Sequence, residues 1–390
     1  MNKGFLKRDK ALIVDAQGKT AHLKGVNFGG WLMMEAYFVY APNLPQRVFE
    51  KEFTQQHGGQ ALSELMGRFR DNFITEADFK QVASWGMNCI RLPFHYKVGA
   101  DVHMISYLDR AIAWARQHKV YLILDLHAAP GAQNHDWHSD SLGKAELWTK
   151  KTNRHKTYDL WQKLADRYKD ETIIAGYDVL NEAVLQDADL LNEFYRETIK
   201  AIRRVDQNHI LFIEGKHWAQ QIDVLDDFKD DNWVYSIHFY EPPEFTFNLV
   251  PFLRYPWDGC TKDIISRRMD GYFRFAQKKK RPVHVGEFGV NYRQGFYNEH
   301  LYLKDVLKCF NDLGFHWSYW TYKAVKNYLH PDGVYGYRPN SPWVNRPAVK
   351  PGWHCWADCW PKYKEDMTSS WRTKSFDLNT HVIEELKKAL

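Results

Sequence analysis

The sequence predicts an α/β fold, a (β/α)8 TIM barrel with long loops after its third and eighth strands. Eight short apolar runs, rich in β-branched residues, alternate with helical patterns along the 390 residues. Most runs are continuously apolar, as expected of parallel strands whose two faces are both covered. Parallel neighbours require crossover connections, so eight alternations favour a closed barrel of strands inside a ring of helices.

The predicted strands span residues 22–29, 88–94, 120–126, 174–180, 209–213, 234–239, 282–285 and 316–320. Between them, Thr75 and Asp78 have the spacing of a helix N-terminus, and Gly86 follows as a stop. Ser106 is predicted to open the next helix. Further helices are predicted over 191–202, 264–277 and 301–313, and a last one over 381–390.

Two segments interrupt this alternation: residues 130–146 after the third strand and residues 323–377 after the eighth. Long irregular segments in a compact domain are usually lids or binding loops. We expect a single catalytic domain over residues 1–390, with 323–377 as an aromatic-rich insertion. Its tryptophans either wall off the active-site pocket or form a small core beneath a long loop; they are Trp343, Trp353, Trp356, Trp360 and Trp371.

Composition describes an ordinary globular chain, with 44% hydrophobic and 16% aromatic residues and a formal net charge of +5. The one tight basic cluster, residues 278–281, is predicted to be a solvated helix end, and no nucleic-acid partner is expected. The N-terminal segment has no apolar run of the length of a signal peptide or membrane span. We therefore expect a cytoplasmic protein, or a secreted one whose signal peptide is absent from this numbering. Five cysteines do not indicate a disulfide framework.

Polar side chains gather where the predicted strands end, at the edge on which barrel active sites are built. Two apolar runs stop abruptly on a glutamate, at Glu182 and at Glu287. Charged residues are almost never fully buried unless they are paired, so each glutamate is expected to face a site. Two converging carboxylates are what cleavage of a glycosidic bond requires. The other strand-end candidates are Glu35, Arg91, His127, Asn181, His238, Tyr240 and Trp320.

The chain resembles glycoside hydrolase family 5, a family of retaining (β/α)8 glycosidases. The matching stretches are LKGVNFGGWL, NCIRLPFHY, LILDLHAAPGAQN, GYDVLNEA, YSIHFYEP, PVHVGEFGV and SYWTYK, in this order between residues 23 and 323. The first and third stretches, with Glu35 after the first, are most similar to the exo-β-1,3-glucanase branch. Two departures are Ala183, where the family usually has proline, and the residues 135–140, which read HDWHSD in place of small polar residues.

The resemblance implies a role for each candidate. Glu287 would be the nucleophile, with its pKa held down by Arg91, and Glu182 the acid/base. Asn181 would donate to the sugar 2-hydroxyl, and Tyr240 to the nucleophile. The remaining residues would shape the sugar site: His127 and His238 as its lining, Trp320 as its apolar floor, and Glu35 as an acceptor for hydroxyls of the non-reducing sugar.

Several alternatives stay open. The expected function is an exo-acting retaining β-glycosidase on β-glucosides or β-glucan oligosaccharides, without cofactor or metal; the same loops would also suit a lipid, sterol or other aglycone glycoside, or an endo-β-glucanase. Glu214, which ends the fifth strand, competes with Glu182 as the acid. Less favoured hypotheses are a barrel that binds carbohydrate without catalysis and a metal-dependent hydrolase. The metal ligands of that last hypothesis would be His127, His135, Asp136, His138 and Asp140.

Overall fold

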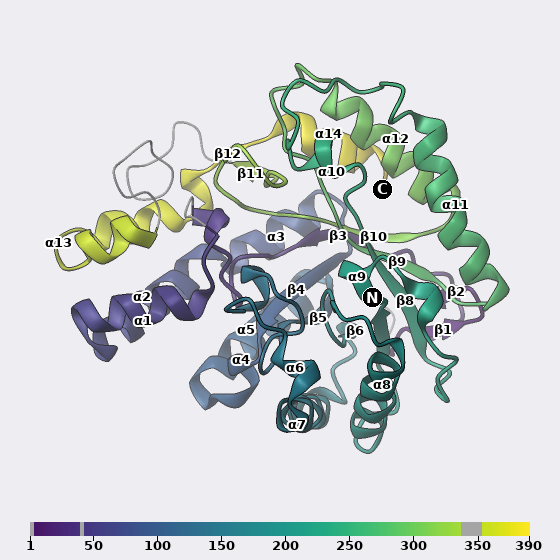
Figure 1. Cartoon of the computed structure of the whole chain (residues 1–390), viewed down its shortest axis with the longest axis horizontal. Coiled ribbons are helices and arrows are strands. Elements are labelled where there is room, and N and C mark those ends of the chain that lie inside the picture. Colours follow the sequence, from purple (N-terminus) through teal and green to yellow (C-terminus); the bar gives the residue numbers. More distant parts are fainter. Residues whose placement is uncertain (1–3, 40–42, 337–352) are drawn as a thin grey trace.

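The computed structural model describes residues 4–39, 43–336 and 353–390. Eight parallel strands close into a barrel in chain order, with the last strand pairing with the first, as predicted (Figure 1). Each predicted strand overlaps one observed strand. The barrel strands are β3 (Lys24–Asn27), β4 (Cys89–His95), β5 (Tyr121–Ala128), β6 (Ile174–Asp178), β7 (Ile210–Glu214), β8 (Trp233–Phe239), β9 (Val283–Phe288) and β10 (His316–Tyr319).

Helices surround the barrel (Figure 1). They are α1 (Gln46–His57), α2 (Gly59–Phe73), α3 (Glu76–Ser84), α4 (Lys97–Ala100), α5 (Val102–His118), α6 (Glu146–Thr149), α7 (Lys151–Tyr168), α8 (Ala188–Arg203), α9 (Lys216–Ala219), α10 (Pro243–Thr246), α11 (Lys262–Lys278), α12 (Glu299–Asp312), α13 (Trp353–Trp371) and α14 (Thr380–Lys388). Short 3-10 turns lie at Ala36–Val39, Trp137–Ser139, Ile222–Val224 and Thr373–Ser375. Within the described residues, no helix is long and apolar enough to cross a bilayer.

The N-terminal hairpin closes one end of the barrel. It pairs β1 (Lys7–Asp9) with β2 (Leu12–Val14). Leu6 and Ile13 are buried and belong to a cluster with apolar side chains of the barrel strands, among them Ile123 and Phe212. Because this end is filled, the open rim at the carboxyl ends of the strands is left for the active site, as in other barrels of this kind.

Two predicted helix starts have different outcomes. Thr75 and Asp78 form the predicted capping box of α3: Thr75 N–H donates to Asp78 Oδ2 over 2.7 Å. The expectation that Ser106 opens α5 is wrong, because α5 begins at Val102 with Asp101 as the N-cap. The Ser106 hydroxyl instead donates back to the carbonyl of His103 over 2.5 Å, so it is satisfied inside the helix.

Part of the segment 323–377 is helical, where its sequence suggested an irregular loop. Its second half forms α13, which packs along α1 and α2 on one side of the barrel (Figure 1, yellow against purple and blue). Trp356, Trp360 and Trp371 are at most 1% exposed. They pack against phenylalanines of α1 and α2, such as Phe49 and Phe69.

The expectation that these tryptophans wall off the pocket is therefore wrong for these three, which form a core between helices. Trp343 and the side chain of Trp353 lie outside the described part of the chain. The segment ends in a short ladder between β11 (Tyr335–Gly336) and β12 (Asp377–Leu378).

Candidate active site

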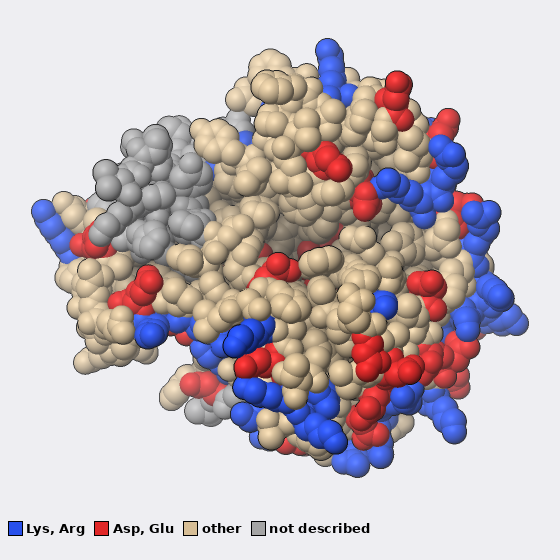
Figure 2. Space-filling view, in the orientation of Figure 1, with Lys and Arg blue, Asp and Glu red and all other residues tan. Residues whose placement is uncertain are grey.

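A cavity of about 300 Å³ opens at the carboxyl ends of the barrel strands. Figure 2 shows a hollow near the centre of this face, with acidic side chains at its edge. Six of the nine predicted site residues line the cavity: Glu35, His127, Glu182, Tyr240, Glu287 and Trp320. The other three, Arg91, Asn181 and His238, are buried behind its wall. Arg91 and His238 hold the carboxylates of Glu287 and Glu182, and Arg91 also binds Asn181.

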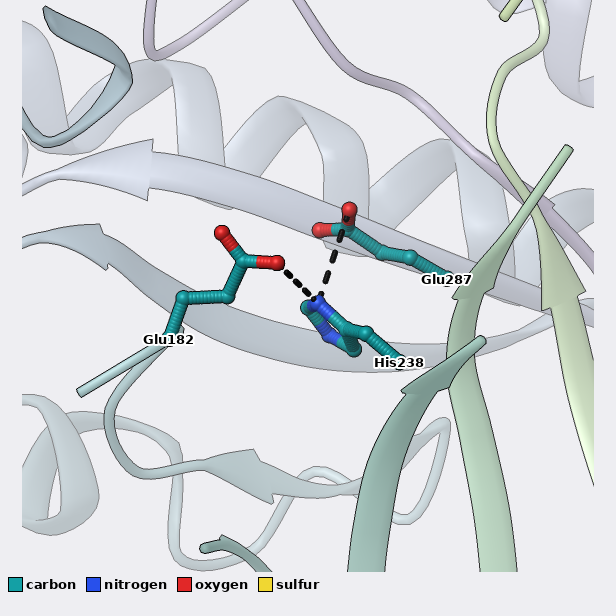
Figure 3. A group of neighbouring side chains, drawn as sticks. All are labelled: Glu182, His238 and Glu287. Carbon is teal, nitrogen blue, oxygen red and sulfur yellow. Dashed lines mark hydrogen bonds and ion pairs between the residues drawn. The ribbon is translucent and has the colours of Figure 1, made fainter. Parts of the chain in front are cut away.

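Glu182 and Glu287 converge from opposite sides of the cavity with His238 between them (Figure 3). Glu182 follows β6 and Glu287 lies near the end of β9. One carboxylate oxygen of each glutamate and one ring nitrogen of His238 all lie within 4.8 Å of one another. The pair that the sequence identified from two separate strands is thus a single cluster in space.

Two donors hold the Glu287 carboxylate. Arg91 Nη1 donates to Oε1 over 2.7 Å, and the Tyr240 hydroxyl donates to Oε2 over 2.8 Å. Burial alone would raise the pKa of Glu287, but the cationic side chains of His238 and Arg91 outweigh it and lower the pKa. Glu287 is therefore ionised at neutral pH, with both of its oxygens in fixed positions.

Arg91 is the hub of this network. Its guanidinium is fully buried and lies within 3.3 Å of oxygens of four carboxylates, those of Asp125, Asp178, Glu214 and Glu287. Burial opposes the charge, yet these carboxylates raise the pKa of Arg91 well above its usual value. A permanent cation with a planar fork of donors suits such a site, because it can orient several carboxylates at once.

Asn181 is also oriented by Arg91. Its side-chain Oδ1 accepts from Arg91 Nη2 over 2.8 Å, which leaves the amide nitrogen as the free donor of this side chain. That nitrogen is buried and has no hydrogen-bond partner among the described residues. Buried donors normally have a partner, so this nitrogen is available to a group that the described residues do not supply.

Glu182 has a backbone conformation that few residues adopt, with φ at +46°. Its N–H donates to Glu214 Oε2 over 2.6 Å, and its carbonyl accepts from Asn134 Nδ2 over 3.0 Å. Both oxygens of Glu214 are occupied, since Oε1 faces Arg91 and His238. Glu214, the competing acid candidate, is fully buried away from the cavity and holds the backbone of Glu182 instead.

His238 links the two glutamates from behind. Its Nδ1 donates to Glu182 Oε1 over 2.7 Å, and its Nε2 lies 3.1 Å from Glu214 Oε1. Burial lowers its pKa, but Glu214, Glu287 and Glu182 together raise the pKa well above the usual value. The surrounding carboxylates therefore favour the imidazolium form, in which both ring nitrogens are donors.

The opposite wall is built on Trp320. The ring of His127 stacks on it at 5.4 Å with an interplanar angle of 7°, and Trp320 Nε1 donates to the Tyr37 hydroxyl over 2.5 Å. His127 lies between Asp125 and Glu35, at 2.8 and 3.3 Å. Burial opposes protonation of His127, but Asp125 and then Glu35 raise its pKa to about 10. Burial raises the pKa of Glu35 despite this contact.

The histidine-rich loop does not assemble into the metal site of the rival hypothesis. Asp140 lies away from the other four candidates: its carboxylate accepts from Arg47 Nε over 2.9 Å and lies 3.0 Å from His95 Nε2. These contacts fix the loop to α1 and to β4. His127, Asp136 and His138 do reach the cavity.

Several residues on the cavity wall were not among the predicted site residues. They are Tyr37, Trp137, Trp218 and Phe247. All lie on loops after β3, β5, β7 and β8. Trp218 has φ at +53°, between His217 at +54° and Ala219 at +61°, and local propensity does not predict such a run of left-handed residues. An acidic residue inside an apolar strand, as at Asp125 and Asp178, is a signal that was available and not used.

Comparison with known proteins places this site in a family. The family model described as "Cellulase (glycosyl hydrolase family 5)" matches residues 50–326. A "Beta-xylosidase" of Phanerodontia chrysosporium is 33% identical over 351 residues, which cover 82% of this chain and 71% of that protein. "Endoglucanase C" of Acetivibrio thermocellus is 26% identical, with 77% of this chain and 91% of that protein covered.

The expected branch is represented too. A "Probable glucan 1,3-beta-glucosidase A" of Emericella nidulans is 30% identical, covering 53% of this chain and 56% of that protein. Among solved structures, Thermotoga maritima Cel5A in complex with mannotriose has a TM-score of 0.62 at 17% identity, over 93% of this chain and 96% of the other. The chain is thus an enzyme of the glycoside hydrolase type, and it belongs to glycoside hydrolase family 5.

Proposed function

We propose that this protein is a retaining β-glycosidase in which Glu287 attacks the anomeric carbon and Glu182 protonates the leaving oxygen. The observation that carries the proposal is the spacing of the two carboxylates, whose nearest oxygens lie within 4.8 Å. Retaining enzymes hold their carboxyl groups about 5–5.5 Å apart, whereas inverting enzymes need about 6.5–9.5 Å to admit a water. The lowered pKa of Glu287 supports its role as the ionised nucleophile.

The surrounding groups suit a sugar in the position that this reaction requires. The unpaired amide of Asn181 is a ready donor for the 2-hydroxyl, a contact that strengthens in the transition state. Trp320 offers an apolar surface for a ring face. Glu35 Oε1 is buried and lies 3.3 Å from His127 Nε2, and no described residue makes a hydrogen bond to it. Together the two side chains supply an acceptor and a donor for sugar hydroxyls.

The cavity shape favours exo action on β-glucosides. Tyr37, Trp137 and His330 come from three different loops, and their ring centroids lie 4.8 to 5.9 Å apart. This ring cluster is anchored to Trp320, because Trp320 Nε1 donates a hydrogen bond to the Tyr37 hydroxyl. A glucan that extended past Trp320 would collide with this ring cluster. Only the terminal sugar of a chain therefore fits next to Trp320. The likeness to a glucan 1,3-beta-glucosidase supports glucose as that unit.

A second candidate is a β-glycoside with an apolar aglycone. Trp218 lines the cavity with 41% of its surface exposed, and Phe247 is half-buried on the same wall. Aromatic faces at an open rim bind apolar groups as readily as sugar rings. Because the relatives include a xylosidase and an endoglucanase, activity on other sugars and endo action are also tested below.

The deciding experiment combines stereochemistry with a product profile. Hydrolysis of an aryl β-glucoside is followed by proton NMR, and we expect β-glucose as the first product, with the α anomer appearing only by mutarotation. A β-1,3-glucan oligosaccharide should release glucose alone from the first minutes. Immediate α-glucose would contradict the retaining mechanism, and mixed oligosaccharides would contradict exo action. A preference for aryl or alkyl aglycones over glucan would favour the second candidate.

A further inference from the structure

The loop after β5 wraps over Glu182 and is fixed at both ends. Asn134 donates to the Glu182 carbonyl and accepts from Asp136 N–H over 2.9 Å. At the far end, Asp140 is held by Arg47 and His95. Between these anchors, the 3-10 turn Trp137–Ser139 directs His138 to the cavity.

His138 lies between two carboxylates. Its Nε2 is 3.5 Å from Glu182 Oε2 and 3.6 Å from Asp136 Oδ2, and its side chain is 16% exposed. These distances are those of ion pairs, and a shift of about half an ångström would turn either into a hydrogen bond. Contacts of this kind often tighten only when substrate is bound.

The two oxygens of Glu182 have different surroundings. Oε1 accepts from His238 over 2.7 Å, whereas Oε2 faces His138. Because His238 is cationic and donates to Oε1, the proton that Glu182 transfers must sit on Oε2. During the first step, this proton moves from Oε2 to the glycosidic oxygen, which leaves with the C–O bonding electrons. At the same time, an oxygen of Glu287 bonds the anomeric carbon. Negative charge then develops at Oε2, next to His138.

The charges around His138 favour a cation at this place. The titratable groups that face it are Asp136 on its own loop, Glu182 after β6, Glu35 after β3, His127 of β5 and His330 after β10. Burial lowers the pKa of His138 and His127 opposes its charge, but Asp136, Glu182 and Glu35 outweigh both and raise the pKa. Burial, followed by His138, lowers the pKa of His330 to about 4, so that ring is neutral and does not compete.

Asp136 is itself anchored by the strained loop after β7. Trp218 Nε1 donates to Asp136 Oδ2 over 2.8 Å, the same oxygen that faces His138. Trp218 and its two neighbours keep left-handed backbone conformations that cost energy and persist only where other contacts impose them. Asp136 therefore joins an exposed wall residue of the cavity to the histidine beside the acid.

We infer that His138, oriented by Asp136, is a positioning residue that stabilises the carboxylate formed at Glu182 Oε2 as the leaving group takes its proton. This inference rests on the proposed roles of Glu182 and Glu287. It assigns a function to the stretch HDWHSD, in which this chain departs from its family's pattern. His138 acts through Glu182 and makes no bond to the reacting carbon.

The test compares two leaving groups in the full-length enzyme. Phenyl β-glucoside needs protonation of its leaving oxygen, whereas dinitrophenyl β-glucoside does not. In His138→Ala, we expect kcat/KM for the phenyl substrate to fall about tenfold or more, because acid catalysis contributes about 10²–10⁴-fold and part of it is lost. For the dinitrophenyl substrate, kcat/KM should fall less than about twofold.

The pH profile separates this role from a structural one. Loss of the His138 cation should move the alkaline limb of kcat/KM for the phenyl substrate up by about one pH unit. Asp136→Asn, which retains an acceptor for Trp218, should move it in the same direction. The control is His135→Asn, an exposed neighbour on the same loop, for which neither quantity should change.

Equal losses on both substrates with an unmoved alkaline limb would overturn the inference and leave His138 a loop-packing residue. Thermal denaturation of each variant identifies a folding defect, and His138→Gln then provides a smaller change at the same site. Failure of the proposed function looks different: the wild-type enzyme itself would hydrolyse neither substrate, or would release α-glucose first.

Discussion

Glu214 accepts the backbone N–H of Glu182 over 2.6 Å, although the two residues lie on neighbouring strand ends and both are acidic. This contact holds Glu182 at φ +46° and turns its side chain toward the cavity. The other oxygen of Glu214 faces Arg91 and His238, so one carboxylate holds the backbone of the proposed acid and also pairs with two buried cations. Glu214 is thus a support for the site.

Replacement of Glu214 by alanine should affect folding and catalysis together. Removing one partner of a buried charge pair costs about 3–5 kcal/mol, and we expect the lower end because three other carboxylates still surround Arg91. The free energy of unfolding is measured by urea denaturation, and kcat should fall at least about tenfold as Glu182 loses its anchor. Glu197→Ala on α8, whose side chain is half exposed, is the control. Full activity in Glu214→Ala would contradict this support role.

Glu287→Gln should abolish turnover while leaving sugar binding largely intact. Glutamine keeps the shape and can still bind Tyr240, but it cannot form the glycosyl ester. We expect kcat to fall at least about 10⁴-fold, as for other covalent nucleophiles. Calorimetry with a non-hydrolysable glucoside should show an affinity within about tenfold of wild type. Substantial residual turnover would mean that another residue attacks the sugar.

Glu182→Ala separates the two carboxylate roles. Without the acid, kcat/KM should fall far more for phenyl than for dinitrophenyl β-glucoside, because only the former needs a proton. Azide should restore turnover of the dinitrophenyl substrate by attacking the glycosyl-enzyme in the space that Glu182 vacates. The product, identified by NMR, should be β-glucosyl azide. An α-glucosyl azide would show that Glu182 is the nucleophile and Glu287 the acid.

The barrel and its two central glutamates could be predicted because their signals are local. The buried run that begins with β6 reaches Glu182, and β9 contains Glu287, so in each case apolar residues and the glutamate are close together in the sequence. Arg91 was found in the same way. The conformations of the loops could not be predicted, because they depend on partners that are distant in the sequence. Asp140, for example, pairs with Arg47, and Trp218 with Asp136. The buried side chains of α13 do recur at helical spacing, at Trp356, Trp360, Met367 and Trp371. The helix was missed because Pro361 lies inside it, and proline normally argues against a helix interior.

Activity should persist to unusually low pH. His238 and Arg91 lower the pKa of Glu287, so its carboxylate stays ionised below the ordinary glutamate value of about 4.3. The acidic limb of kcat/KM should therefore lie below about pH 4. The ionised group also stabilises the fold above its unfolded pKa, and this contribution is lost as pH falls through the lowered folded value.

Replacing His238 by asparagine removes the cation and should move the acidic limb up by about one pH unit. Tyr240→Phe is the matched comparison, since it removes a donor to Glu287 without removing charge, and should move the limb less. The measurement is kcat/KM against pH with dinitrophenyl β-glucoside, which is insensitive to the acid. If the acidic limb of the pH profile does not move in His238→Asn, that limb reports the titration of a group other than Glu287.

The aromatic core of α13 predicts a separation between stability and activity. Trp356 is fully buried against Phe49, Phe69 and Trp371, so Trp356→Ala should lower the free energy of unfolding by about 3–5 kcal/mol. Its kcat/KM under native conditions should stay within about twofold, because the side chain does not reach the cavity. Trp218→Ala is the opposite case, because the Trp218 side chain is 41% exposed and lines the cavity. We expect it to lower kcat/KM clearly while the free energy of unfolding changes little. A large activity loss in a stably folded Trp356→Ala enzyme would instead couple α13 to the substrate site.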